Sequence, residues 1–272
     1  TNLLSYSIVL LGGTLSVTKL MELGFNGIFF VIIQMTITIV GAMYIGKKLG
    51  FSQNFRMLMA SGNAVCGSSA IAATAPVIDA NDDDKGITIT VVNITGIFLM
   101  FLLPVLSGYL YNHEVVRTSA MIGGTLQSVG QVVASGEMVN EHVKELATIF
   151  KIVRVILLVG VIFVLGHIKQ KTNHEIVEEE ISDVKKGKIK IPWYVIGFFI
   201  TCALFTLNII SPEVSYLFKA ISNKLEIIAL AAIGLRVNLR ELIKQGKSVS
   251  LYALFVGSLQ VVTAIALISI FL

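Results

Sequence analysis

Long apolar runs separated by short polar connections make up most of the chain. A run of about 18 or more apolar residues is long enough to cross a bilayer as a helix. The pattern predicts about nine such spans, at residues 3–20, 27–44, 56–78, 86–110, 118–139, 146–166, 192–210, 225–239 and 248–272. We therefore expect an all-α polytopic membrane protein. Because Thr1 already lies inside an apolar run, we also expect that an N-terminal segment precedes it.

The composition narrows the class further. Of the 272 residues, 55% are hydrophobic and 14% are charged, whereas soluble domains carry about 25% charged residues. The net charge of +4 resides in the connections and gives no basis for binding nucleic acid. Cys66 and Cys202 lie far apart in apolar runs, so we interpret them as buried small side chains and not as a disulfide or a metal site. The sequence shows no nucleotide-binding loop and no nucleophile–base set, so we expect neither an enzyme nor a bound cofactor.

The charges of the connections predict an orientation. Basic residues gather in the connections at 47–56, 167–191 and 236–247, and the positive-inside rule places such connections in the cytoplasm. If every segment crosses once, the acidic connections at 79–84 and 141–145 lie outside. The expected location is the cell (inner) membrane, with several passes.

Two segments combine small and hydroxyl side chains inside apolar runs: GNAVCGSSAIAATAP at 62–76 and GGTLQSVGQVVASGE at 123–137. Glycines weaken a helix, and Pro76 removes a backbone donor near the end of the first segment. One interpretation is a small-residue face on which two helices pack closely. The other is a discontinuous helix whose freed backbone groups and hydroxyls bind a substrate.

The connections divide the chain into a first membrane bundle, a linker and a second bundle. The first bundle, 1–166, contains the small-residue helices at 56–78 and 118–139. The linker, 167–191, is expected to be cytoplasmic, and the second bundle is 192–272. Residues 231–246 resemble residues 10–24 and run in the opposite direction under the orientation above, which is typical of inverted-repeat transporters. The same orientation makes the two small-residue segments parallel.

Lys151 and Arg154 are the charges that point most strongly to function. They lie three residues apart, hence on one helix face, and Arg154 is roughly 12 Å into its span at 1.5 Å per residue. A buried charge costs at least ~2.5 kcal/mol and usually faces a cavity or a partner. The alternatives are snorkelling to the surface, which suits Lys151 better than Arg154, and pairing with Glu137 or Glu226 from other spans. Without such a partner, the two cations suit an anion.

Neutral polar residues of the two small-residue segments complete the predicted site. The substrate-binding candidates are Gly67, Ser68, Ser69, Thr125, Gln127, Ser128 and Gln131, together with Lys151 and Arg154. Four of them, Ser68, Ser69, Thr125 and Gln127, are also candidates for a sodium site. Each hydroxyl can equally bond to its own helix. Asn93 and Asn208 are interpreted as hydrogen bonds between helices.

At CGSSAIAATAPVI, GGTLQSVGQVVASG, KIVR and LAAIGLRVNLREL, the sequence resembles the YeiH-like sulfate exporter family. The resemblance covers essentially the whole chain and implies a bacterial inner-membrane protein of about ten or eleven spans. More distantly, the chain looks like the bile acid–sodium symporter group. That likeness implies two crossed, broken helices at 62–76 and 123–137.

The leading hypothesis is a secondary transporter of a small anion, with sulfate as the first candidate, working by alternating access. The half-helix N-termini would cradle the anion, and coupling to Na⁺ or H⁺ is expected. The alternatives are a sodium-coupled symporter of an organic acid and a non-transporting membrane scaffold or sensor. The expected partners are the lipid bilayer, the anion and a second copy in a homodimer.

Overall fold

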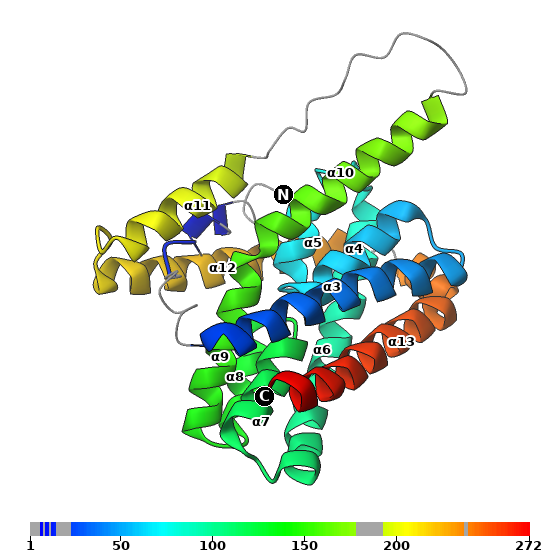
Figure 1. Ribbon diagram of the computed structural model, residues 1–272. Coiled ribbons are helices and arrows are strands. Elements are labelled where there is room, and N and C mark those ends of the chain that lie inside the picture. Colours follow the sequence, from blue (N-terminus) through cyan, green and yellow to red (C-terminus); the bar gives the residue numbers. More distant parts are fainter. Residues whose placement is uncertain (1–5, 8, 11, 15–22, 178–192, 237–238) are drawn as a thin grey trace.

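The computed structural model describes residues 6–7, 9–10, 12–14, 23–177, 193–236 and 239–272, and its regular elements are all helices (Figure 1). From residue 23 onward they are α3 (Gly24–Lys48), α4 (Gln53–Ala64), α5 (Ser68–Thr74), α6 (Asp82–Tyr111), α7 (Val115–Thr125), α8 (Val129–Glu137), α9 (Glu141–Ile156), α10 (Leu158–Val177), α11 (Trp193–Thr206), α12 (Pro212–Arg236) and α13 (Leu239–Phe271). The all-α prediction is confirmed for this part of the chain.

Four helical stretches among the described residues are long and apolar enough to cross a membrane. They are Gly24–Lys48, Asp82–Tyr111, Glu141–Gln170 and Gly246–Phe271. These stretches match four of the predicted spans. The segments predicted as spans at 56–78 and 118–139 are instead each divided into two short helices.

The first divided segment, α4 and α5, is a hairpin that returns to the end from which it started. Asn54 Nδ2, at the start of α4, donates a hydrogen bond of 3.3 Å to the carbonyl of Asp79, beyond α5. Nearer the tip, a Cβ on Gly62 would lie 2.7 Å from Ile71 Cδ1. These two contacts pair the helices in antiparallel register. The chain turns at residues 65–67, where Gly67 has a φ of +68° that suits glycine.

The second divided segment, α7 and α8, is also a hairpin. Ser119 Oγ donates to the carbonyl of Val143 at 3.2 Å, and Gly123 packs on the backbone of Ala147. Both pairs are separated by 24 residues, so α7 and α9 run parallel. A short turn joins α8 to α9, where Glu137 pairs with Lys144 at 2.8 Å. Since α8 leads back to the start of α9, it runs antiparallel to α7.

The two hairpins enter the bundle from opposite ends, because α6, with 30 residues, lies between them in the chain. The first hairpin starts and ends where α3 ends and α6 begins; we call this the Lys48 end. The second starts and ends where α6 ends and α9 begins; we call this the Tyr111 end.

This arrangement corrects the predicted topology. Neither small-residue segment crosses the bundle, and they are opposed, not parallel. The basic connection at 47–56 and the acidic connection at 79–84 therefore lie at the same end. The assumption of one crossing per segment was wrong because the packing of α5 on α4 reverses the chain.

The packing groups also differ from the predicted division at 167–191. Helix α13 packs antiparallel on α3, where Gln34 Nε2 donates to the carbonyl of Gln260 at 2.8 Å and Tyr252 OH donates to that of Ala42 at 2.6 Å. It therefore belongs with the first bundle. Helices α11 and α12 lie together at one side (Figure 1), where Ser7 hydrogen-bonds Ser222.

The predicted linker begins as helix, because α10 continues to Val177. The rest of the linker up to residue 191 lies outside the described residues, as do most of residues 10–24. The inverted repeat between 10–24 and 231–246 therefore stays a prediction.

Side-chain caps set where the helices of the hairpins begin. Ser52 accepts from Phe55 N at the start of α4, and Glu114 accepts from two backbone N–H groups at the start of α7. Ser128 caps α8 in a capping box with Gln131, and Asn140 caps α9. Such caps satisfy donors that the first turn of a helix leaves free.

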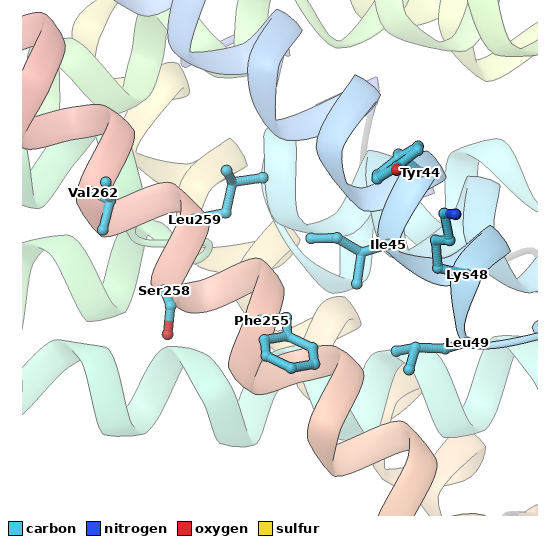
Figure 2. Close-up of a pocket in the computed structure, with 8 residues that line it drawn as sticks. All are labelled: Tyr44, Ile45, Lys48, Leu49, Phe255, Ser258, Leu259 and Val262. Carbon is cyan, nitrogen blue, oxygen red and sulfur yellow. The ribbon is translucent and has the colours of Figure 1, made fainter.

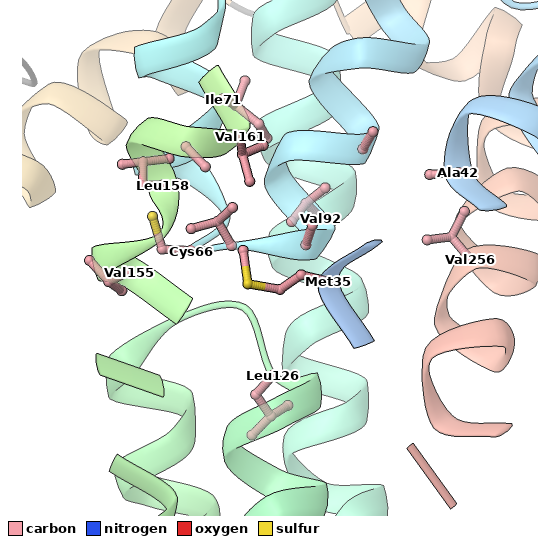
Figure 3. Packing of buried hydrophobic residues seen from close by; sticks show 14 of the residues in the cluster. Met35, Ala42, Cys66, Ile71, Val92, Leu126, Val155, Leu158, Val161 and Val256 are labelled. Carbon is pink, nitrogen blue, oxygen red and sulfur yellow. The ribbon is translucent and has the colours of Figure 1, made fainter. Parts of the chain in front are cut away.

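The tip of the first hairpin lies in the hydrophobic core. Cys66, Ile71 and Val92 are buried there, next to Val155 and Leu158 of α9 and α10 (Figure 3). The predicted role of Cys66 as a buried small side chain is confirmed.

An apolar groove of about 500 Å³ runs between α3 and α13, lined by Tyr44, Ile45, Lys48, Leu49, Phe255, Ser258, Leu259 and Val262 (Figure 2). It shares no residue with the predicted substrate site.

Candidate functional site

Lys151 and Arg154 lie in the centre of the bundle, where both hairpin tips meet α9. Lys151 is 0% and Arg154 is 1% exposed. This burial rules out the snorkelling alternative for Lys151 in this conformation. Lys151 Nζ donates to the carbonyl of Val65 in the first tip and, at 2.8 Å, to that of Leu126 in the second.

Arg154 links the same two tips with all five of its N–H bonds. Its Nε donates to Ala64 O at 3.0 Å. One terminal nitrogen donates to Gly123 O at 3.2 Å and Leu126 O at 2.8 Å. The other donates to Asn63 O and Ala64 O, both at 2.8 Å. In this conformation the guanidinium caps both broken helices, and it has no donor left for a direct bond to an anion.

No carboxylate neutralises this pair among the described side chains. Glu137, one of the two predicted partners, is bound to Lys144 at 2.8 Å. The side chain of the other, Glu226, lies outside what the structure describes. The three ion pairs observed among the described side chains involve Lys85 and Lys144 as cations. The partners of Lys151 and Arg154 are backbone carbonyls, which composition and spacing do not reveal.

Helix ends explain why carbonyls can hold the two cations. The C-termini of α4 and α7 both point at Lys151 and Arg154, and a helix C-terminus carries roughly half a negative charge. Two such ends offset about one of the two positive charges. With both side chains protonated, the pair keeps a positive charge of about one after the two helix ends are counted.

The N-terminal ends of α5 and α8 begin at the same tips. Gly67 precedes α5, which has no side-chain cap. At α8, Ser128 Oγ accepts from Gly130 N, and Gln131 Oε1 accepts from Ser128 N at 3.0 Å. Thus Ser128 and Gln131, both predicted as substrate ligands, also serve as the cap of α8.

Asn93 of α6 lies between the two N-terminal ends. A Cβ built on Gly67 would lie 3.9 Å from Asn93 Oδ1. On the other side, Gln131 Nε2 donates to the carbonyl of Asn93 at 3.5 Å. The half-buried side chain of Asn93 makes no hydrogen bond to the described residues. The prediction that it bonds helices together is wrong for this side chain.

A cluster of four buried amides joins the tips to α3 and α13; we call Gln34, Asn63, Gln127 and Gln260 the amide cluster. Gln127 Nε2 donates to Asn63 Oδ1 and to Gln260 Oε1, both at 3.3 Å. Gln260 Nε2 donates to Asn63 O at 2.9 Å. The buried carbonyl of Asn63 thus receives bonds from Arg154 and Gln260.

Sequence reasoning found Gln127 but missed the importance of Asn63, Gln260 and Gly96. Asn63 is part of the small-residue segment and Gln260 is an amide inside an apolar run, so both gave a signal. Gly96 gave none: it leaves room for two amides, since a Cβ there would lie 2.7 Å from Gln127 Oε1 and 2.5 Å from Gln131 Oε1.

Two predicted residues carry buried oxygens next to this site. Thr125 Oγ1 and Gln127 Oε1 have no hydrogen-bond partner among the described residues, and the same holds for Gln34 Oε1 of α3. Ser68 and Ser69 are buried at the start of α5, directly after Gly67. The structure therefore brings the predicted residues of both tips together, whereas Asn208 follows α11 at the side of the bundle.

Comparison with known proteins identifies the family. The family model described as Conserved hypothetical protein 698 matches residues 1–253. A UPF0324 membrane protein of Clostridium perfringens is 49% identical over all of this chain and 80% of the relative. One of Lactiplantibacillus plantarum is 50% identical over all of this chain and 81% of the relative.

The UPF0324 inner membrane protein YeiH of Salmonella typhi is 30% identical over 93% of this chain and 71% of the relative. No solved structure matches, and the likeness to bile acid–sodium symporters is not among these findings. The chain belongs to the UPF0324 family of membrane proteins, which includes YeiH.

Proposed function

We propose that this protein is a secondary transporter of a small anion that works by alternating access. The observation that supports this most is the meeting of two opposed hairpins around a buried pair of cations that have no carboxylate partner among the described side chains. Transporters of several folds bind their substrates near the middle of the membrane, at the ends of broken helices.

The charge balance favours an anion over a cation. Lys151 and Arg154 cover the negative ends of α4 and α7, whereas the positive end of α8 begins at the same tip as the end of α7, next to Asn93. An anion at this place would interact with this helix N-terminus and with the two cations behind it. Burial increases these interactions, since the effective dielectric constant is lower there than in water.

We propose sulfate as the first anion to test, because the sequence resembles the sulfate exporter family. The hairpins enter from opposite ends, so α4–α6 and α7–α9 form an inverted pair, which is the arrangement expected when a protein alternates between two faces. The Lys48 end, with Lys47, Lys48 and Arg56, is placed in the cytoplasm by the positive-inside rule. A relative named an inner membrane protein supports that membrane for this chain.

A sodium-coupled symporter of an organic acid is the second candidate. It is favoured by the unpartnered oxygens of Thr125 and Gln127, both in the predicted sodium set. A sodium ion there would lie close to the two cations, so it would have to enter together with an anion. A sodium gradient that drives uptake would select this candidate.

The experiment compares Lys151→Met with Lys144→Met in proteoliposomes. Both lysines lie on α9, but Lys151 is buried without a carboxylate, whereas Lys144 is paired with Glu137 and Glu141. Uptake of sulfate, a dianion, is compared with uptake of methanesulfonate, a monoanion. Coulomb energy is proportional to the charge of the ligand. The factor by which Lys151→Met raises KM for sulfate is therefore expected to be about the square of the factor by which it raises KM for methanesulfonate.

The Lys144→Met control is expected to leave both KM values unchanged. An equal effect of Lys151→Met on the two anions would show that the lysine only supports the fold. No uptake of any anion by the wild-type protein would refute the proposal and leave a membrane scaffold or sensor as the alternative.

A further inference from the structure

Gln127, at the tip of the second hairpin, presents only a hydrogen-bond acceptor to a ligand. Both N–H groups of its amide are already used, by Asn63 Oδ1 and Gln260 Oε1. Two oxygens of the amide cluster, Gln34 Oε1 and Gln127 Oε1, are buried and have no partner among the described residues. Buried polar groups are nearly always satisfied, so such oxygens need an explanation.

The neighbours determine which way these amides point. Turning the amide of Gln127 would place its oxygen against two other oxygens, Asn63 Oδ1 and Gln260 Oε1. Turning that of Gln34 would place its oxygen against the carbonyl of Gln260. Both alternatives replace a hydrogen bond by repulsion between acceptors, so the free oxygens follow from the network.

The free oxygen of Gln127 lies where the proposed anion would bind. Leu126, the preceding residue, is held by Lys151 and Arg154. The Gln127 oxygen itself lies beside Gly96 and Gln131, one helical turn from Asn93. Thr125 Oγ1, two residues away, is also buried and unpartnered. A ligand at this position therefore meets positive charge and unsatisfied acceptors together.

A fully ionised oxyanion such as sulfate offers acceptors only. It would satisfy the charge but leave Gln127 Oε1 without a donor. A simple cation would satisfy the oxygen but lie next to two buried positive charges. We infer that the preferred substrate is a small anion that carries its own hydrogen-bond donor, a hydroxyl or N–H group, which Gln127 Oε1 accepts. This inference rests on the proposed function and specifies its substrate class.

Two sulfonates of equal charge test the inference in proteoliposomes of the wild-type protein: ethanesulfonate and 2-hydroxyethanesulfonate. They differ by one hydroxyl group. Because leaving a buried acceptor unpaired is costly, kcat/KM for the hydroxylated anion is expected to be about tenfold to a hundredfold higher. Gln127→Met should bring that ratio close to one by removing the acceptor.

Gln170→Met is the matched control: Gln170 is a half-buried glutamine of α10, outside the amide cluster. It is expected to keep the wild-type ratio. If Gln127→Met does not fold, the ratio of kcat/KM for the two sulfonates in the wild-type protein tests the inference by itself. Equal transport of the two sulfonates by the wild-type protein would refute the inference. Water or sodium would then satisfy Gln127 Oε1. Transport of neither sulfonate nor of sulfate would refute the proposed function, and the inference with it.

Discussion

Replacing Arg154 by Met is expected to destabilise the protein, because the guanidinium holds both hairpin tips. Arg154 binds four carbonyls. Without it, Leu126 O would still accept from Lys151, and Asn63 O would still accept from Gln260. Ala64 O loses both of its bonds from Arg154, and Gly123 O loses its one. Leaving one buried group unsatisfied costs about 1–3 kcal/mol, so the free energy of unfolding should fall by about 2–6 kcal/mol for these two carbonyls.

The assay is thermal unfolding of the purified protein in lipid nanodiscs. With about 2–4 °C for each kcal/mol, Arg154→Met should lower Tm by at least about 4 °C. Arg154→Lys keeps the charge and three donors, so a smaller decrease is expected. An unchanged Tm in Arg154→Met together with abolished anion uptake would refute this reasoning. The arginine would then be a substrate ligand that the fold does not need.

Three further predictions concern the architecture. Gly123→Ala should lower the free energy of unfolding by ~1–3 kcal/mol, because the added Cβ would meet the backbone of α9. The control Gly160→Ala should be neutral or stabilising, because no atom lies within 4 Å of the added Cβ. Tyr252→Phe should lower the free energy of unfolding by about 1 kcal/mol, since its hydroxyl donates to a backbone carbonyl of α3; an unchanged Tm would contradict that bond. Asp83→Cys and Glu141→Cys should react with a membrane-impermeant maleimide from opposite faces of the membrane, Asp83→Cys from the cytoplasmic face. Labelling of Asp83→Cys from outside would contradict the hairpin topology.

The sequence allowed us to predict where the two helical segments break, but not that the chain reverses its direction at each break. Glycines and hydroxyl side chains indicate a weak helix at Gly67 and again near Ser128. The segment 56–78 is nevertheless as long as a membrane span, and length alone favours a crossing. What reverses the chain is tertiary packing, such as that of Ile71 on Gly62, to which length and composition give no guide.

The candidate site was predicted in part for the same reason. Lys151 and Arg154 stood out as charges in an apolar run, and the polar residues of both tips were noted. Their partners are backbone carbonyls of residues such as Ala64, which carry no side-chain signal. The role of Gly96 depends on which helix face meets Gln127, and that is known only from the fold.

Counterflow of radiolabelled sulfate into proteoliposomes that contain excess unlabelled sulfate tests anion transport most directly. It is measured with and without sodium and proton gradients, against liposomes that lack the protein. Labelled sulfate is expected to accumulate above the level of the empty liposomes with the wild-type protein and with Lys144→Met, but not with Lys151→Met. Background-level uptake of sulfate under every gradient, with the same result for 2-hydroxyethanesulfonate, would contradict anion transport by this protein.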